Sequence, residues 1–230
     1  MMEFIGNSLF FGAAVSLLAY WGGMLLRRKL HSAAVNPLLI AVALVIALLA
    51  LTGISYEDYY AGAKYISYLL TPATVALAVP LYRQFTLLRH NAKAIAAGIL
   101  SGVASSIGCI FGMALLFGFT HEEYVTFLPK SITTAIGMGV SEELGGYAAI
   151  TAAVIIVTGI LGNILGDLVF RLFRIEEPVA RGIALGSASH AIGTAKAMEL
   201  GETEGAMSSL SIVISGVITV AAAMLAAGWV

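Results

Sequence analysis

The sequence predicts an all-α polytopic membrane protein with an inverted-repeat architecture of the secondary-transporter type, containing two broken helices and one re-entrant segment. Three observations predict this fold class. First, 60% of the 230 residues are hydrophobic and 11% are charged, whereas a typical soluble domain has roughly 45–50% apolar and about 25% charged residues. Second, several runs without Asp, Glu, Lys or Arg are as long as a membrane span. Third, one pattern recurs after 114 residues, which is about half the chain.

Five uncharged runs are long enough to cross a bilayer as helices. A helix that rises about 1.5 Å per residue needs about 20 apolar residues to cross roughly 30 Å of hydrocarbon. The runs are Phe4–Leu26, Pro37–Ser55, Ala94–Thr120, Gly145–Gly166 and Gly205–Val230. We expect the first to be a mature helix, because it is too long for a removed signal peptide and lacks a cleavage pattern.

Three further segments are apolar but carry proline or charge. They are Tyr65–Tyr82 with Pro72 and Pro80, Thr126–Ser141 with Pro129 and Lys130, and Gly182–Met198 with His190 and Lys196. Such segments at membrane depth are expected to be interrupted, re-entrant or buried in protein.

Clusters of basic residues predict the orientation of the spans, because Lys and Arg beside a span resist translocation. Nine of the 12 Lys and Arg residues form three clusters: Arg27, Arg28 and Lys29; Arg83, Arg89 and Lys93; and Arg171, Arg174 and Arg181. Ten of the 13 acidic residues lie away from these clusters, and one of the ten, Glu3, precedes the first span. We therefore expect the clusters to face the cytoplasm and the N-terminus to be external.

This orientation assigns a path to the two charged segments. Glu122, Glu123, Glu142 and Glu143 bracket Thr126–Ser141, so that segment is expected to enter and leave on the external face as a re-entrant loop. Gly182–Met198 begins beside Arg181 and ends beside Glu199. We expect it to cross the membrane as a broken or protein-buried segment.

An internal repeat is indicated when the chain is shifted by 114 residues. Ser101–Val103 then aligns with Ser215–Val217, Pro37–Ser55 falls on Thr151–Leu165, and Ala94–Thr120 falls near the final span. By the charge count these pairs run in opposite directions. We therefore expect one transmembrane domain, residues 1–230, made of two repeats of roughly 1–115 and 116–230. Inverted repeats with an interrupted segment in each half are typical of secondary transporters, although shared membrane composition is an alternative explanation.

The interruptions predict where a ligand binds. Non-helical backbone at membrane depth is tolerated only where protein or a water-filled cavity satisfies it. Pro72 removes an amide donor between Thr71 and Thr74, and the stretch from Gly186 to Thr194 supplies flexible backbone and hydroxyls in the second half. Two facing half-helix N-termini would offer free N–H groups and positive dipole ends to an anion. A plain kink at Pro72 is the alternative.

Lys130 and Lys196 are the only Lys or Arg residues at apparent membrane depth, where charge is costly and therefore indicates function. Hydroxyls beside Lys130 add donors for a carboxylate. The alternatives are a tether for Lys130 and snorkelling of Lys196 toward the external face. His190 is either a donor or proton carrier, or a buried structural histidine.

The candidate residues form two sets. The substrate-binding candidates are Thr71, Thr74, Lys130, Ser131, Thr133, Thr134, Ser187, Ser189, His190, Thr194 and Lys196. The ion-coupling candidates are Asn163 and Asp167. A structural pair of Asp167 with Arg171, four residues later on one helix face, is the alternative for the second set.

Other functions are disfavoured. The sequence lacks the HExxH zinc motif, the Gly-x-Ser-x-Gly elbow and the phosphate-binding loop. Ser189 and His190 are adjacent and would point to different helix faces, which suits a nucleophile and its base poorly. A net charge of −1 gives no nucleic-acid footprint. We expect no catalysis, no cofactor, no metal and no nucleic-acid partner.

Four motifs in this order resemble one family. They are Asn36–Ile40, Pro72–Tyr82, Leu128–Thr134 and Arg181–Thr194, and Glu204–Ser209 continues the last. Together they resemble the LrgB/CidB family of bacterial membrane proteins over nearly the whole chain, and they are similar to the membrane domain of the plant plastidic glycolate/glycerate translocator.

The resemblance implies a multi-pass protein of the bacterial inner membrane with a possible small LrgA/CidA-like partner. It also implies one of two functions: transport of small monocarboxylates, or modulation of murein hydrolase activity and autolysis. Broken helices and embedded lysines favour transport. We expect a secondary transporter of glycolate, glycerate, pyruvate or a similar acid that works by alternating access, with a holin- or antiholin-like protein as the alternative. A carrier this short offers little surface for a stationary scaffold, so we expect at least a homodimer.

Overall fold

The computed structural model describes residues 10–30, 36–69, 72, 75–76 and 78–230. These residues are almost entirely helical, and none of them lies in a strand. Contacts divide the chain into two compact units, Met1–Ala76 and Leu77–Val230, each of which is described by itself. Among the described residues, Ala92–Phe117, Ala148–Leu172 and Glu202–Trp229 are long and apolar enough to cross a membrane, as three of the five predicted spans require.

The first unit contains three described helices. They are α2 (Phe11–Leu30), α3 (Pro37–Thr52) and α4 (Tyr56–Ser67). Glycines let their backbones approach closely: a Cβ at Gly12 would overlap the backbone of Tyr59 in α4, and one at Gly23 would overlap that of Pro37 in α3. Small residues at such crossings are typical of helices packed in membranes.

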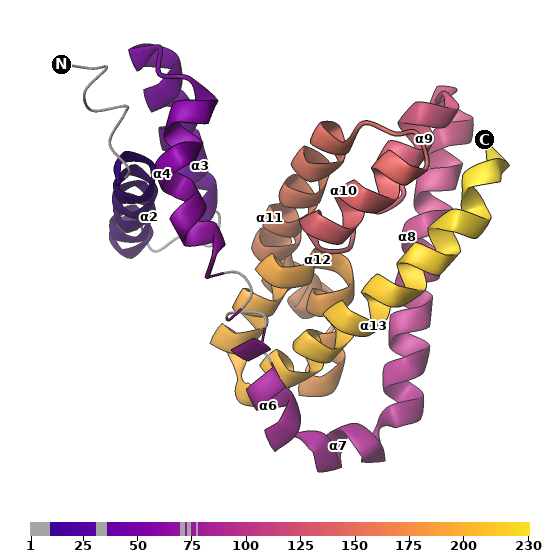
Figure 1. Cartoon of the computed structure of the whole chain (residues 1–230). Coiled ribbons are helices and arrows are strands. Elements are labelled where there is room, and N and C mark those ends of the chain that lie inside the picture. The colour runs from indigo at the N-terminus through magenta and orange to yellow at the C-terminus, as the bar shows by residue number, and fades with distance from the viewer. Residues whose placement is uncertain (1–9, 31–35, 70–71, 73–74, 77) are drawn as a thin grey trace. The chain divides into compact units, whose positions relative to one another are not determined.

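The second unit contains the remaining elements. They are α6 (Ala78–Arg83), α7 (Phe85–His90), α8 (Ala92–Phe117), α9 (His121–Phe127), α10 (Thr134–Glu143), α11 (Ala148–Leu172), α12 (Pro178–Leu200), α13 (Glu202–Ala226) and the 3₁₀ turn η1 (Ala227–Trp229). Helix α8 runs from the end with α7 to the end with α9 (Figure 1). The main core lies between α8, α9 and α13. Its stripe on α8 recurs every three or four residues, as an amphipathic helix requires: Ile95, Ile99, Val103, Ile107 and Ile110.

Helices α8 and α13 run in the same direction. Arg83, shortly before α8, lies 3.7 Å from Glu202 at the start of α13. At the other end, the rings of Phe111 and Trp229 contact each other with centroids 5.3 Å apart. The prediction that this pair of the repeat runs in opposite directions is therefore wrong. Two uncharged helices align by composition alone, which says nothing about their direction.

The same contact corrects the placement of the last acidic group. Charge counting puts Glu199, Glu202 and Glu204 on the face opposite the basic clusters, but Glu202 lies beside Arg83. Both side chains are more than half exposed, so the contact contributes little stability. It nevertheless shows that acidic and basic residues share one end of this unit.

The segment from α9 to α10 returns to its starting point. The hydroxyl of Thr151, near the start of α11, lies 3.0 Å from the Thr126 carbonyl and 2.7 Å from the Ser141 hydroxyl. The Tyr147 amide donates to the Thr126 hydroxyl at 2.8 Å. Both ends of the segment are therefore held at the start of α11, and Lys130 lies in the turn between them.

Helix α12 also turns back on itself. His190 has φ 43° and ψ −131° within it, a left-handed backbone that costs a non-glycine residue about 1–3 kcal/mol. A Cβ at Gly193 would overlap the carbonyl of Leu185, so the outgoing limb after His190 lies against the incoming limb before it.

The fold of α12 overturns the predicted crossing of Gly182–Met198. A Cβ at Gly182 would overlap the Glu204 carbonyl, and one at Gly205 would lie 2.9 Å from the Met198 side chain. Both ends of α12 therefore lie at the start of α13. The basic and acidic flanks of this segment are at one end because the chain reverses at His190.

The interface of α12 with α13 yields a stability prediction. A Cβ at Gly186 would overlap the Ser208 carbonyl, whereas nothing lies within 4 Å of the Cβ position of Gly108. Gly186→Ala should lower the free energy of unfolding by about 1–3 kcal/mol, because backbone must move apart. Gly108→Ala, the matched control, should be neutral or slightly stabilising. Thermal unfolding in detergent measures both, and equal effects would contradict the close packing.

Candidate functional site

A cavity of about 430 Å³ lies where the two returning segments meet α8 and α11. We call it the central hollow. Its side chains come from four parts of the chain that are distant in sequence. The hydroxyls and the charge lining it belong to Ser105, Ser106, Lys130, Ser131, Thr158, Ser187 and Ser189. Four predicted substrate residues, at positions 130, 131, 187 and 189, are thus brought together.

Lys130 supplies the charge of the central hollow. Its Nζ donates to the Ser131 hydroxyl at 2.9 Å, and that hydroxyl lies 3.1 Å from the hydroxyl of Ser106. Among the described residues, no carboxylate lies within ion-pair distance of Lys130. An ammonium group has three donors, and one of them is used here. The hollow therefore suits an anion that accepts a charge-assisted hydrogen bond.

The tip of α12, just before its reversal, supplies two further hydroxyls to the lining of the central hollow. Ser187 is buried and donates to the carbonyl of Ile183 in its own helix at 2.7 Å, and Ser189 is also buried. Helix α11 passes so close that a Cβ at Gly162 would overlap the Ser189 hydroxyl. A glycine at position 162 is therefore needed for the tip to sit at the hollow.

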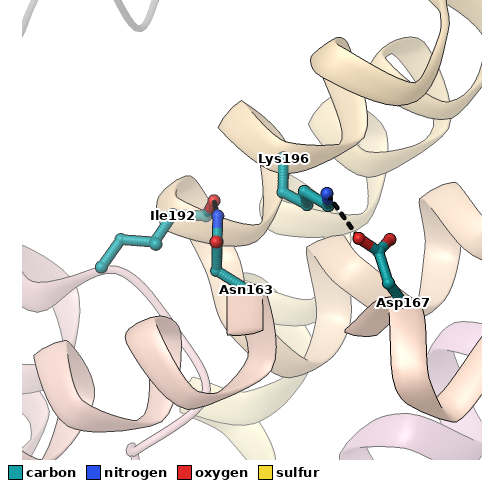
Figure 2. Close-up of polar contacts among 4 residues, drawn as sticks. All are labelled: Asn163, Asp167, Ile192 and Lys196. Atoms are coloured by element: carbon teal, nitrogen blue, oxygen red, sulfur yellow. Dashed lines mark hydrogen bonds and ion pairs between the residues drawn. The ribbon is translucent and has the colours of Figure 1, made fainter. Parts of the chain in front are cut away.

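Three contacts provide hydrogen-bond partners at the reversal of α12: one to the His190 ring and two to backbone carbonyls. The His190 Nε2 lies 2.9 Å from the carbonyl of Ile155, which means that this nitrogen carries the proton and donates. Thr194 donates to the His190 carbonyl at 3.1 Å. Asn163 lies 3.4 Å from the carbonyl of Ile192 (Figure 2). His190 and Thr194, both predicted to bind substrate, hold the turn and do not line the central hollow.

Lys196 forms an ion pair with Asp167. The Nζ and a carboxylate oxygen lie 2.8 Å apart, with side chains 13% and 29% exposed (Figure 2). The pair joins α11 to the outgoing limb of α12. The predicted pairing of Asp167 with Arg171 is wrong, because the carboxylate faces α12. Lys196 does not line the hollow, so the two lysines at apparent membrane depth have different surroundings.

The remaining candidates lie elsewhere. Thr133 occupies the N-cap position of α10 without a side-chain cap, and Thr134 begins the helix; neither lines the hollow. Thr71 and Thr74 lie outside the described residues, so the paired break around Pro72 stays a prediction. Among the described residues, no group of three or more His, Cys, Asp or Glu side chains is placed to hold a metal.

Sequence reasoning missed the face that α8 presents to the hollow. Ser105 and Cys109 are four residues apart, and Gly102 and Ser106 repeat that spacing. This stripe lies away from the isoleucine stripe of α8. Small polar residues recurring every four positions in an uncharged span were the available signal.

The ion pair of Figure 2 yields a second stability prediction. Asp167→Asn or Lys196→Met should each lower the free energy of unfolding by about 1–3 kcal/mol, because each leaves a partly buried charge without its partner. The double variant should recover most of the loss, because it removes both charges. Thermal unfolding of the four proteins in one detergent measures the coupling. Additive losses would contradict it.

Comparison with known proteins identifies a family. Residues 16–229 match the LrgB-like family. The holin-like protein CidB of Staphylococcus aureus strain Mu50 is 38% identical over 205 residues, which cover 89% of this chain and 90% of that protein. The antiholin-like protein LrgB of Bacillus cereus strain B4264 is 39% identical over 214 residues, which cover 92% of each protein.

A holin-like protein CidB of Staphylococcus epidermidis is 37% identical over 205 residues. No solved structure matches this chain. One family accounts for nearly the full length, including both returning segments and the central hollow. The chain therefore belongs to the LrgB-like family.

Proposed function

We propose that this protein is a membrane carrier for small monocarboxylates, such as glycolate, glycerate or pyruvate, which bind in the central hollow. The observation that carries the proposal is the ammonium group of Lys130, which lies among serine hydroxyls with no carboxylate of the described residues beside it. A carboxylate would neutralise this charge and accept its free donors. The volume of about 430 Å³ is ample for an acid of a few carbon atoms.

The proposal includes a moving part. Alternating access requires a site that opens to one side at a time. The incoming limb of α12 packs against α13 through Gly182 and Gly186, and the outgoing limb is joined to α11 by Asp167 and Lys196. Movement of this hairpin would change the positions of Ser187 and Ser189 at the hollow. The proposal further places the protein in the bacterial inner membrane, with an external N-terminus and at least two copies, and it includes no catalytic step.

A holin- or antiholin-like role is the second candidate, and the names of the relatives favour it. The similar proteins bear the names holin-like protein CidB and antiholin-like protein LrgB. In that case the protein would modulate murein hydrolase activity and autolysis, together with a small LrgA/CidA-like membrane partner. An ammonium group in the hollow with no carboxylate of the described residues beside it has no evident use in an unselective pore.

Flux measurements on the purified protein in liposomes separate the two candidates. A carrier should give uptake of labelled pyruvate or glycolate that saturates and is inhibited by unlabelled acid. A pore should release unrelated solutes up to a size limit, without saturation. The second result would overturn the carrier proposal.

The role of Lys130 is tested by replacing its charge. Lys130→Met should reduce saturable uptake at low solute concentration by about tenfold to a hundredfold, the value of a hydrogen bond to a charged group of about 1.5–3 kcal/mol. Lys130→Arg should retain more uptake because it keeps the charge. Lys29→Met, which removes an exposed lysine that lines neither the hollow nor any other cavity described, is the matched control. Full uptake by Lys130→Met would remove this residue from the site.

A further inference from the structure

A second cavity leads away from the central hollow. Its volume is about 540 Å³, and it follows the seam between α8 and the incoming limb of α12. Four residues line both cavities: Gly102, Ser105, Ser187 and Ala188. The two spaces are therefore adjacent, and we call the second one the seam groove.

The seam groove extends to one end of the unit. It is lined there by Asn91 and Glu177, the residues that immediately precede α8 and α12. Lys93 and Arg181 lie in the first turns of the same two helices. We call this end the basic face after Lys93 and Arg181, although two acidic residues also lie there: Glu177, which lines the groove, and Glu202 beside Arg83.

Toward α9 and α10 the protein beside the central hollow is packed, whereas Cys109, Leu161 and Leu165 of the hollow's lining are exposed. The turn between α9 and α10 buries Leu128 and Ile132, which are 0% and 1% exposed. The Ser131 hydroxyl in that turn lies 3.1 Å from the Ser106 hydroxyl of α8. The hollow therefore continues along the seam toward the basic face, while packed side chains lie on the side of α9 and α10.

Small residues line both walls of the seam groove. Ala94, Gly98 and Gly102 recur every four positions on α8, and Ala180, Ala184 and Ala188 do so on α12. A Cβ at Gly98 would lie 3.1 Å from Ile183 across the seam. Larger side chains on either wall would occupy the space through which the two cavities adjoin.

We propose that the seam groove is the passage by which an anion moves between the central hollow and the basic face, with Glu177 at its mouth. This inference rests on the proposed carrier function, because it assigns a route to the solute of that carrier. The structure then represents the state that is open to the basic face. The carboxylate of Glu177 opposes the entry of anions, an effect that grows with the charge of the solute.

Cys109, the single cysteine, is free and exposed, and it lines the central hollow. It provides a native reporter of access. The probe is 2-sulfonatoethyl methanethiosulfonate, an anionic thiol reagent that does not cross membranes, applied to vesicles of either orientation. Mass spectrometry of the labelled peptide gives the rate at Cys109. A Lys93→Cys variant marks the side of the vesicle that carries the basic face.

The passage predicts labelling of Cys109 from the basic face. Ala94→Leu and Ala184→Leu, one on each wall, should each slow it by about tenfold. Ala104→Leu, an exposed position on α8 that lines neither cavity, is the matched control and should not slow it. Glu177→Gln, a surface change that leaves the packing intact, should raise the rate for this anionic reagent but not for a trimethylammonium analogue.

Faster labelling from the opposite face would overturn the passage, as would equal rates in the wall variants and the control. An unchanged rate in Glu177→Gln would remove Glu177 from the mouth. Protection of Cys109 by pyruvate or glycolate is scored separately. Unprotected Cys109 together with slowed labelling in the wall variants contradicts the carrier proposal, whereas protection without slowing contradicts the passage alone.

Discussion

The absence of water in a bilayer interior is the constraint on which this architecture depends. Every peptide group at membrane depth must find a partner within the protein, and both returning segments meet this requirement with side-chain hydroxyls, amides or imidazole. At the start of α11, Thr126, Ser141 and Thr151 satisfy one another. At the turn of α12, Thr194 and Asn163 contact freed carbonyls. The unusual backbone of His190 is held by its own hydrogen bond to α11.

Because the chain reverses at these two hydrogen-bonded turns, the central hollow is left beside them. Each segment stops partway along α8 and reverses, so neither fills the space beside Gly102 and Ser105. The polar side chains at the two tips then line one cavity. Two lysines belong to these segments, and their surroundings differ: Lys196 is neutralised by Asp167, whereas Lys130 contacts a hydroxyl. This difference in charge balance is the reason that we propose the hollow, and not the ion pair, as the anion site.

Prediction from the sequence succeeded where the physical signal is local. Uncharged runs of sufficient length located the helices α8, α11 and α13, and the largest difference at an end is that α11 continues past the predicted Gly166 to Leu172. Cost of charge at membrane depth singled out Lys130, and hydroxyls near expected interruptions singled out Ser187 and Ser189; these three side chains line one cavity, and their role in binding is a proposal. The failures concern direction and partner. Flanking charges predicted that the two ends of Gly182–Met198 lie on opposite faces, and helical spacing predicted a pair of Asp167 with Arg171. Neither signal depends on which residues the segment contacts in the folded protein.

The sequence by itself determined that the chain is a helical membrane protein of the LrgB-like family, because hydrophobic length and motif order are properties of the chain alone. The tertiary structure decided which helices are parallel, that α12 reverses at His190, and which polar side chains share a cavity. Those features depend on contacts between residues far apart in sequence, such as Gly162 with Ser189 and Lys196 with Asp167. Hydrophobicity carries no information about such contacts, because every membrane-buried face is apolar whichever neighbour it meets.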